Sequence, residues 1–100
     1  MQRINLSDGR WFDLDRATKW NEATRWDGSN HLSIATGSQW HHEALYLTAS
    51  GTWIINSWSQ WQGSRASWEI VEPDQAARWL VVNGHELPDS LSDIGAALEV

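Results

Sequence analysis

The segment Trp40-His41-His42-Glu43-Ala44 holds the densest group of side chains that could do chemistry. Imidazole and carboxylate groups are common zinc ligands, and both serve as general acids and bases. In a strand, however, His41 and Glu43 project to one face and His42 to the other. Two adjacent histidines of a regular strand cannot both reach one ion, and the spacing matches no zinc motif. We therefore predict no metal and no other cofactor, and we expect an exposed loop-to-strand junction whose histidines stack on neighbouring indoles.

Hydrolytic chemistry has little support elsewhere in the chain. Gly-Ser pairs occur in "TGSQW" (36–40) and "WQGSR" (61–65), but neither lies in the strand–turn–helix setting of a nucleophile elbow. Glu43 could act with Glu69 or Glu72 as an acid–base pair, yet nothing in the sequence places them together. We predict no catalytic residue, and an enzyme built on His41, His42 and Glu43 is the third of three hypotheses.

Tryptophan dominates the aromatic composition, with nine residues against one Phe and one Tyr. A domain of this size buries under ~70% of its unfolded surface, so its core is thin. Large rings help such a core, because each can bury ~150–250 Å². We expect core packing to use most of four tryptophans: Trp11, Trp53, Trp68 and Trp79.

A second tryptophan group lies in the stretch Ser57–Gln62, where indoles alternate with hydroxyl and amide side chains. Such mixtures stack on sugars or bind peptides, and Trp is a favoured anchor at protein interfaces. The sequence thus predicts a small non-enzymatic binding module whose partner is another protein or a second copy. The alternative ligand is a carbohydrate or a small aromatic molecule. The predicted binding residues are Trp58, Gln60, Trp61 and Gln62.

Charge and composition exclude several partners. The net charge of −6, with seven Lys and Arg residues, disfavours a phosphate-binding surface, so we expect no nucleic acid partner. The absence of cysteine excludes disulfides and thiol chemistry. No apolar run approaches ~20 residues, and "MQRINLSDGR" lacks the apolar core of a signal peptide. A cytoplasmic location without membrane contact is therefore expected.

The clearest structural element is a hairpin over residues 43–61, with its turn at Ala49-Ser50-Gly51. Strand alternation puts Trp53, Ile55 and Trp61 on one face. Trp58 falls on the other face, beside polar neighbours, where an open sheet surface would leave it accessible. A bulge near Ser57 would move the later residues across the sheet.

Other elements are predicted from turn signals and periodicity. Strands are expected at 3–6 and 10–14 around an Asp-Gly turn, and also at 31–36 and 68–71. Residues 13–26 are expected to form a short helix, followed by a loop at 26–30. A main helix over 73–83 is indicated by Pro73, the spacing of Ala76, Trp79 and Leu80, and the Asn83-Gly84 stop. The rival interpretation makes residues 78–82 a strand ending in a hairpin turn.

These elements predict a single α+β domain over residues 1–88. One antiparallel sheet of four to six strands packs against the main helix of residues 73–83. Residues 89–100 are expected to form a short C-terminal helix or tail, because Leu91, Ile94 and Leu98 have helical spacing but Gly95 interrupts them.

"LYLTASGTWIINSWSQWQGS" (45–64) and "ARWLVVNGHELP" (77–88) resemble a set of small, Trp-rich bacterial proteins. These proteins share a Leu-Tyr-x-Thr strand, a Gly turn, a Trp-Ser-x-Trp-Gln-Gly strand and a helix with Ala-x-x-Trp-Leu. The resemblance covers residues 45–88. It implies an intracellular bacterial accessory protein; no activity comes with it, and no catalytic residue is carried over.

Overall fold

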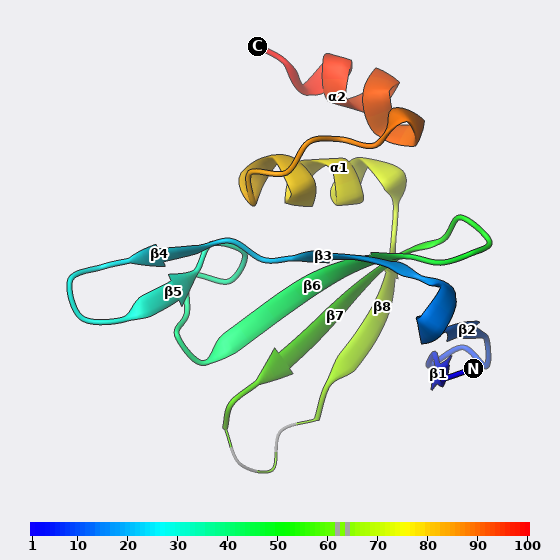
Figure 1. Cartoon of the computed structure of the whole chain (residues 1–100), viewed down its shortest axis with the longest axis horizontal. Coiled ribbons are helices and arrows are strands. Elements are labelled where there is room, and N and C mark those ends of the chain that lie inside the picture. The colour runs from blue at the N-terminus through cyan, green and yellow to red at the C-terminus, as the bar shows by residue number, and fades with distance from the viewer. Residues whose placement is uncertain (62, 64) are drawn as a thin grey trace.

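The computed structural model describes residues 1–61, 63 and 65–100. Its centre is a four-stranded antiparallel sheet in the order β3-β6-β7-β8 (Figure 1). The strands are β3 (Thr18–Asn21), β6 (His41–Leu47), β7 (Trp53–Ser59) and β8 (Ser67–Val71). The α+β class and the hairpin of residues 43–61 are confirmed. The remaining strands do not join this sheet, as they form two separate hairpins.

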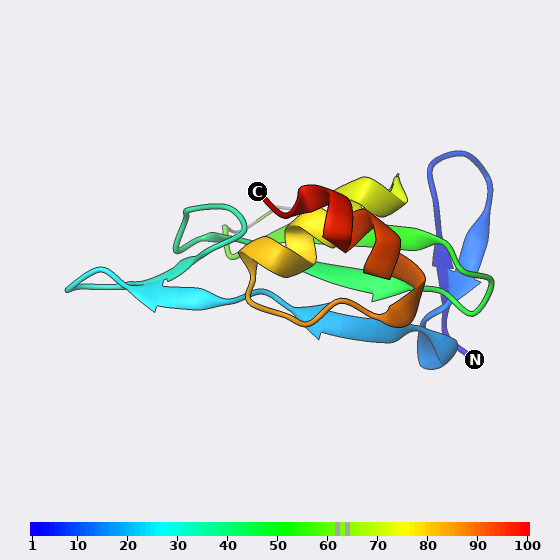
Figure 2. The same cartoon turned by 90° about the horizontal axis from the view of Figure 1, so that it is seen from above.

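Each of these hairpins has two short strands around an Asp-Gly turn. The first pairs β1 (Arg3–Asn5) with β2 (Trp11–Asp13), which confirms the expected N-terminal hairpin. The second pairs β4 (Thr24–Trp26) with β5 (His31–Ser33) and projects from the side of the main sheet (Figures 1 and 2).

The helix expected over residues 13–26 is wrong. A single 3₁₀ turn, η1 (Leu14–Arg16), is capped by the Asp13 side chain, and the chain then enters β3 and β4. Pairing with β6 sets Trp20 opposite Leu45, and the Trp20 ring packs against Trp53 with centroids 5.4 Å apart. These tertiary contacts outweigh a weak helical pattern that Thr and Asn residues already disfavoured.

The main helix is confirmed as α1 (Pro73–Val82). Pro73 occupies its first turn, and Glu72 and Gln75 form a capping box. The chain leaves α1 through Gly84, whose φ of +75° favours glycine. It then forms η2 (Asp89–Leu91) and α2 (Ser92–Leu98), so the C-terminal segment is helical.

Gly95 does not interrupt α2. The Leu87 side chain packs against Gly95 and occupies the space that a Cβ at this position would need. The absence of a Cβ allows this close approach, and the helix continues through Gly95.

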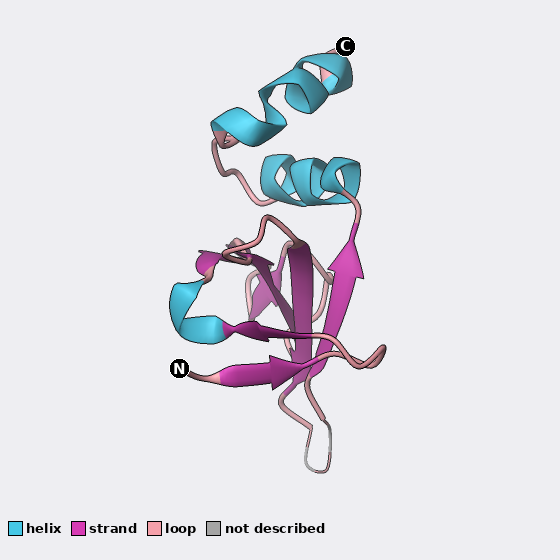
Figure 3. Ribbon diagram, turned by 90° about the vertical axis from the view of Figure 1, so that its right-hand side faces the viewer, coloured by secondary structure: helices cyan, strands magenta, loops and turns pink. Residues whose placement is uncertain are grey.

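The helices stack over one face of the sheet, with α1 between the sheet and α2 (Figure 3). The core on this side includes Leu45, Trp53, Trp79, Leu80 and Leu91. The burial of Trp53 and Trp79 confirms their assignment to the core.

The opposite face of the sheet is also covered. A second cluster there consists of Phe12, Ala44, Tyr46 and Ile54, with Trp68 half-buried in edge-to-face contact with Phe12. Trp11 is 51% exposed, which contradicts its assignment to the core. Strand alternation turns Phe12 inward and Trp11 outward, and the Arg3 guanidinium lies 5.0 Å from the Trp11 ring centroid.

In the described part of the chain, no helix is both long and apolar enough to cross a membrane.

Candidate binding site

The helix-side face of the sheet has an apolar half and a polar half. Figure 1 shows α1 above one end of the sheet, while β6, β7 and β8 extend beyond it. The side chains under the helices are apolar, among them Leu45 and Trp53. The same face beyond them carries polar side chains from the start of β6, the end of β7 and the start of β8. They are His41, Glu43, Ser57, Ser59 and Ser67.

Strand register arranges these polar residues in rows. Ser57 is paired with Glu43 on one side and with Ser67 on the other, so the three form one row. His41 and Ser59 form the next row. Together they line a shallow depression of about 440 Å³. The described residues that line it are Thr36, His41, His42, Glu43, Ser57, Trp58, Ser59, Arg65 and Ser67.

Two exposed indoles meet at this end of the sheet. Trp40 precedes His41, and Trp61 follows Ser59 by two residues. Their ring centroids are 5.2 Å apart at an interplanar angle of 43°, and 42% of Trp40 and 57% of Trp61 remain exposed. The backbone beneath them is fixed, because Gln60 N donates to Trp40 O at 2.9 Å.

The turn before Trp40 is held by side-chain hydroxyls. Thr36 Oγ1 donates to His41 O at 2.6 Å. Ser38 Oγ accepts from Trp40 N at 3.0 Å and from His41 N at 3.2 Å. These bonds set the direction in which Trp40 leaves the strand.

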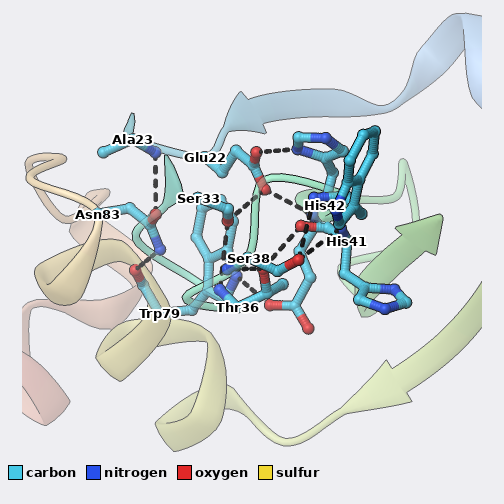
Figure 4. A network of polar contacts seen from close by, with 11 residues as sticks. Glu22, Ala23, Ser33, Thr36, Ser38, His41, His42, Trp79 and Asn83 are labelled. Carbon is cyan, nitrogen blue, oxygen red and sulfur yellow. Dashed lines mark hydrogen bonds and ion pairs between the residues drawn. The ribbon is translucent and has the colours of Figure 1, made fainter. Parts of the chain in front are cut away.

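Glu22 connects this region to the rest of the fold (Figure 4). Its Oε1 accepts from Ser33 Oγ and from Glu43 N, each at 2.7 Å. Its Oε2 lies 2.6 Å from His42 Nδ1, and the two side chains are 10% and 16% exposed. Glu22 thus joins the end of β3 to β5 and to the start of β6.

The floor of the depression is joined to α1. Trp79 Nε1 donates to Glu43 Oε1 at 3.1 Å. Asn83, at the end of α1, donates through Nδ2 to Trp79 O and accepts from Ala23 N (Figure 4). The helix, the link between β3 and β4, and the Glu43 carboxylate therefore hold one another in place.

Comparison with known proteins yields no match to a family model, a curated protein or a solved structure. The resemblance to small Trp-rich bacterial proteins stays a prediction.

The predicted binding residues have different positions. Trp61 lies in the exposed pair with Trp40, and Gln60 is exposed beside it. Trp58 is half-buried; it lines the depression and stacks on the His42 ring at a centroid distance of 5.7 Å. Gln62 lies outside the described residues.

The histidines diverge as strand alternation predicts. Figure 4 shows the His41 and His42 rings on opposite sides of β6. His41 is exposed, as expected, and the stacking of a histidine on an indole is confirmed for His42 and Trp58. His42 is not exposed, however, because Glu22 and Trp58 enclose it. Within the described residues, no group of three or more His, Cys, Asp or Glu side chains could hold a metal ion.

Sequence reasoning missed Trp40 and Glu22 as site residues. Trp40 could have been found, because extending the hairpin register one pair beyond His41↔Ser59 sets it opposite Gln60 and next to Trp61. Glu22 left no comparable signal, since it reaches His42 through the unexpected β3 strand.

Proposed function

We propose that this chain is a small non-enzymatic binding module that holds its partner against the Trp40–Trp61 pair and the adjoining polar depression. The observation that carries the proposal is the pair itself. Two indoles from the start of β6 and the end of β7 meet in the open, at the end of the sheet where His41 and Ser59 line the depression. Partly exposed tryptophans on a fixed backbone are effective binding residues.

The side chains suited to catalysis are occupied in ways that support binding over reaction. Glu22 engages His42, and Trp79 donates to Glu43. His41 stands on the opposite face from His42. An acid–base pair needs both groups within reach of one substrate atom. His41 and Glu43 share the depression, but the hydrogen bond that Glu43 accepts comes from Trp79 and not from His41.

Two partner classes fit an exposed indole pair. The sequence favoured a protein partner or a second copy, with a carbohydrate or small aromatic ligand as the alternative. A cytoplasmic location and an accessory role in a bacterial cell remain predictions of the sequence and its resemblance.

The test compares three proteins: the wild type, the double variant Trp40→Ala/Trp61→Ala, and the control Trp26→Ala. Trp26 is 60% exposed but lies on the separate β4–β5 hairpin. Each protein is tested against an oligosaccharide array, a displayed peptide library and itself in a concentration series. We expect one of these probes to give a saturable signal that the double variant loses and the control keeps. The proposal would be contradicted if the double variant still bound the probe, or if none of the three probes bound the wild type.

A further inference from the structure

We infer that the ligand of this surface is a neutral saccharide, with a sugar ring on the Trp40–Trp61 pair and its hydroxyl groups in the depression. The inference rests on the proposed function of the same surface and names the class of ligand. It follows from the chemistry of the lining and from what that chemistry disfavours.

The lining offers hydrogen-bonding groups of every kind that a sugar hydroxyl can use. The hydroxyls of Ser57 and Ser67 can each donate and accept. The Arg65 guanidinium only donates, and an ionised Glu43 carboxylate only accepts. Glu43 Oε1 already accepts from Trp79, which leaves Oε2 for a ligand.

The spacing of these groups is set by the sheet. Glu43, Ser57 and Ser67 are direct cross-strand neighbours, so their Cβ atoms are about 4.5–5.5 Å apart from one strand to the next. Groups at this spacing on one face of the sheet can contact different hydroxyls of one sugar ring. The contacts come from strands rather than from loops, so their positions are fixed before the ligand arrives.

The indole pair supplies the apolar part of the site. A sugar ring presents C–H groups on its faces and hydroxyls at its edge. The negative face of an indole attracts such C–H groups, and Trp40 and Trp61 each leave much of their surface accessible. A ring stacked there can extend its hydroxyls toward the depression at His41 and Ser59.

The composition of the lining disfavours a protein partner. The cores of protein interfaces are depleted in Ser and Glu and enriched in aromatic residues, Met and Arg. Here three serines, a glutamate and a threonine line the depression, and the described part of the lining has Trp58 and Arg65 as its interface-type residues. A protein would have to desolvate these hydroxyls and satisfy each of them.

Other ligand classes fit less well. Apolar small molecules favour enclosed and mostly hydrophobic pockets, whereas this depression is shallow and polar. Single-stranded nucleic acid also stacks on indoles, but it needs a positive groove, and the chain has a net charge of −6. The same charge, with Glu43 in the lining, disfavours an acidic saccharide.

The inference is tested by titrating neutral oligosaccharides derived from glucan, mannan, xylan, galactan and chitin into the intact chain. Polygalacturonate fragments and a single-stranded oligonucleotide serve as acidic probes. Binding is followed by the ¹H–¹⁵N signals of the indole groups. The variants are Trp61→Ala, Ser57→Ala and Ser67→Ala, with Trp26→Ala as the matched control and circular dichroism as the check on folding.

We expect at least one neutral oligosaccharide to shift the Trp40 and Trp61 signals in a saturable way. Trp61→Ala should weaken its binding at least tenfold, which corresponds to the loss of a stacking contact. Each serine variant should weaken it roughly two- to tenfold, as expected for one hydrogen bond. Trp26→Ala should bind like the wild type.

The possible results distinguish a failure of the saccharide inference from a failure of the proposed function. If no neutral saccharide binds, while a displayed peptide or a second copy binds through Trp61, the saccharide inference is overturned and the proposed function stands. Preference for an acidic probe overturns the inference in the same way. If saccharides bind but Trp61→Ala and the serine variants bind equally well, both the inference and the proposed site are wrong.

Discussion

Glu22 and His42 are 20 positions apart in the sequence, yet Glu22 Oε2 lies 2.6 Å from His42 Nδ1 inside the protein. The second oxygen of the same carboxylate accepts from the backbone N–H of Glu43. One side chain therefore fixes the start of β6, directly beside Trp40 and the depression. His42 Nε2 is buried with no hydrogen-bond partner among the described residues, so the ring depends on Nδ1 for its polar contact.

Replacing Glu22 should be among the most damaging polar changes in this chain. Glu22→Ala leaves the imidazole, the Ser33 hydroxyl and the Glu43 N–H without their acceptor. We expect a loss of about 3–5 kcal/mol in the free energy of unfolding, because each of the groups left without a partner costs about 1–3 kcal/mol. The measurement is urea unfolding followed by far-UV circular dichroism.

A double-mutant cycle checks the cause. Glu22→Ala and His42→Ala should be strongly non-additive, because they share one interaction. Asp74→Ala is the control, since the exposed Asp74–Arg78 pair at 3.9 Å should contribute no more than about 0.5 kcal/mol. Additive effects of the Glu22 and His42 changes would show that the pair has no structural role.

The hydrogen bond from Trp79 to Glu43 can be tested apart from the burial of the indole. Trp79→Phe keeps an aromatic ring in the core but removes the Nε1–H donor. We expect it to cost about 1–3 kcal/mol, because a half-buried carboxylate oxygen loses its partner. Trp79→Ala should cost about 3–5 kcal/mol by adding a cavity. A loss below about 0.5 kcal/mol for Trp79→Phe in thermal or urea unfolding would mean that the hydrogen bond contributes nothing.

The parts of the fold that could be predicted have strong local signals. The hairpin of β6 and β7 follows from alternation, β-branched residues and a glycine turn, and α1 follows from its proline start and i, i+3, i+4 stripe. Residues 13–26 could not be predicted, because their structure is decided by pairing with β6 and by the packing of Trp20 on Trp53. The helix propensity of these residues is too weak to outweigh the strand pairing.

The site was predictable only in part, for a related reason. The opposite directions of His41 and His42 follow from strand alternation alone. Alternation puts Trp61 on the same face as the buried Trp53, so the 57% exposure of Trp61 does not follow from it. The buried pair of Glu22 with His42 depends on three strands meeting, which no single segment encodes. The prediction of an open face around Trp58 was wrong, because the N-terminal hairpin packs on that face. The sequence around Trp58 gives no sign of this packing.

The turn of the β4–β5 hairpin should respond to acid. The backbone N–H of Asn30, and then that of Ser29, donate to the Asp27 carboxylate and hold its pKa below the ordinary value of 3.8. A carboxyl whose folded pKa is depressed stabilises the fold fully above its unfolded pKa and loses that effect as the pH falls through the folded value. We expect the Asn30 and Ser29 amide signals to titrate together below pH 3.8. Asp27→Asn, which still accepts but does not titrate, should abolish that titration; an unchanged titration would contradict the assignment.

Replacing each of the three tryptophans of residues 53–61 by Ala should lower the free energy of unfolding by an amount that depends on how deeply the indole is buried. Trp53 is 5% exposed under α1, so Trp53→Ala should cost about 3–5 kcal/mol. Trp58 is half-buried against the second core cluster and the His42 ring, so we expect about 1–3 kcal/mol for Trp58→Ala, as for a typical destabilising substitution. Trp61 is 57% exposed, and Trp61→Ala should stay within about 0.5 kcal/mol. Urea unfolding of the three variants measures the order directly. If Trp58→Ala were as mild as Trp61→Ala, the N-terminal hairpin would not cover that face in solution, and Trp58 would join Trp61 as an accessible binding residue.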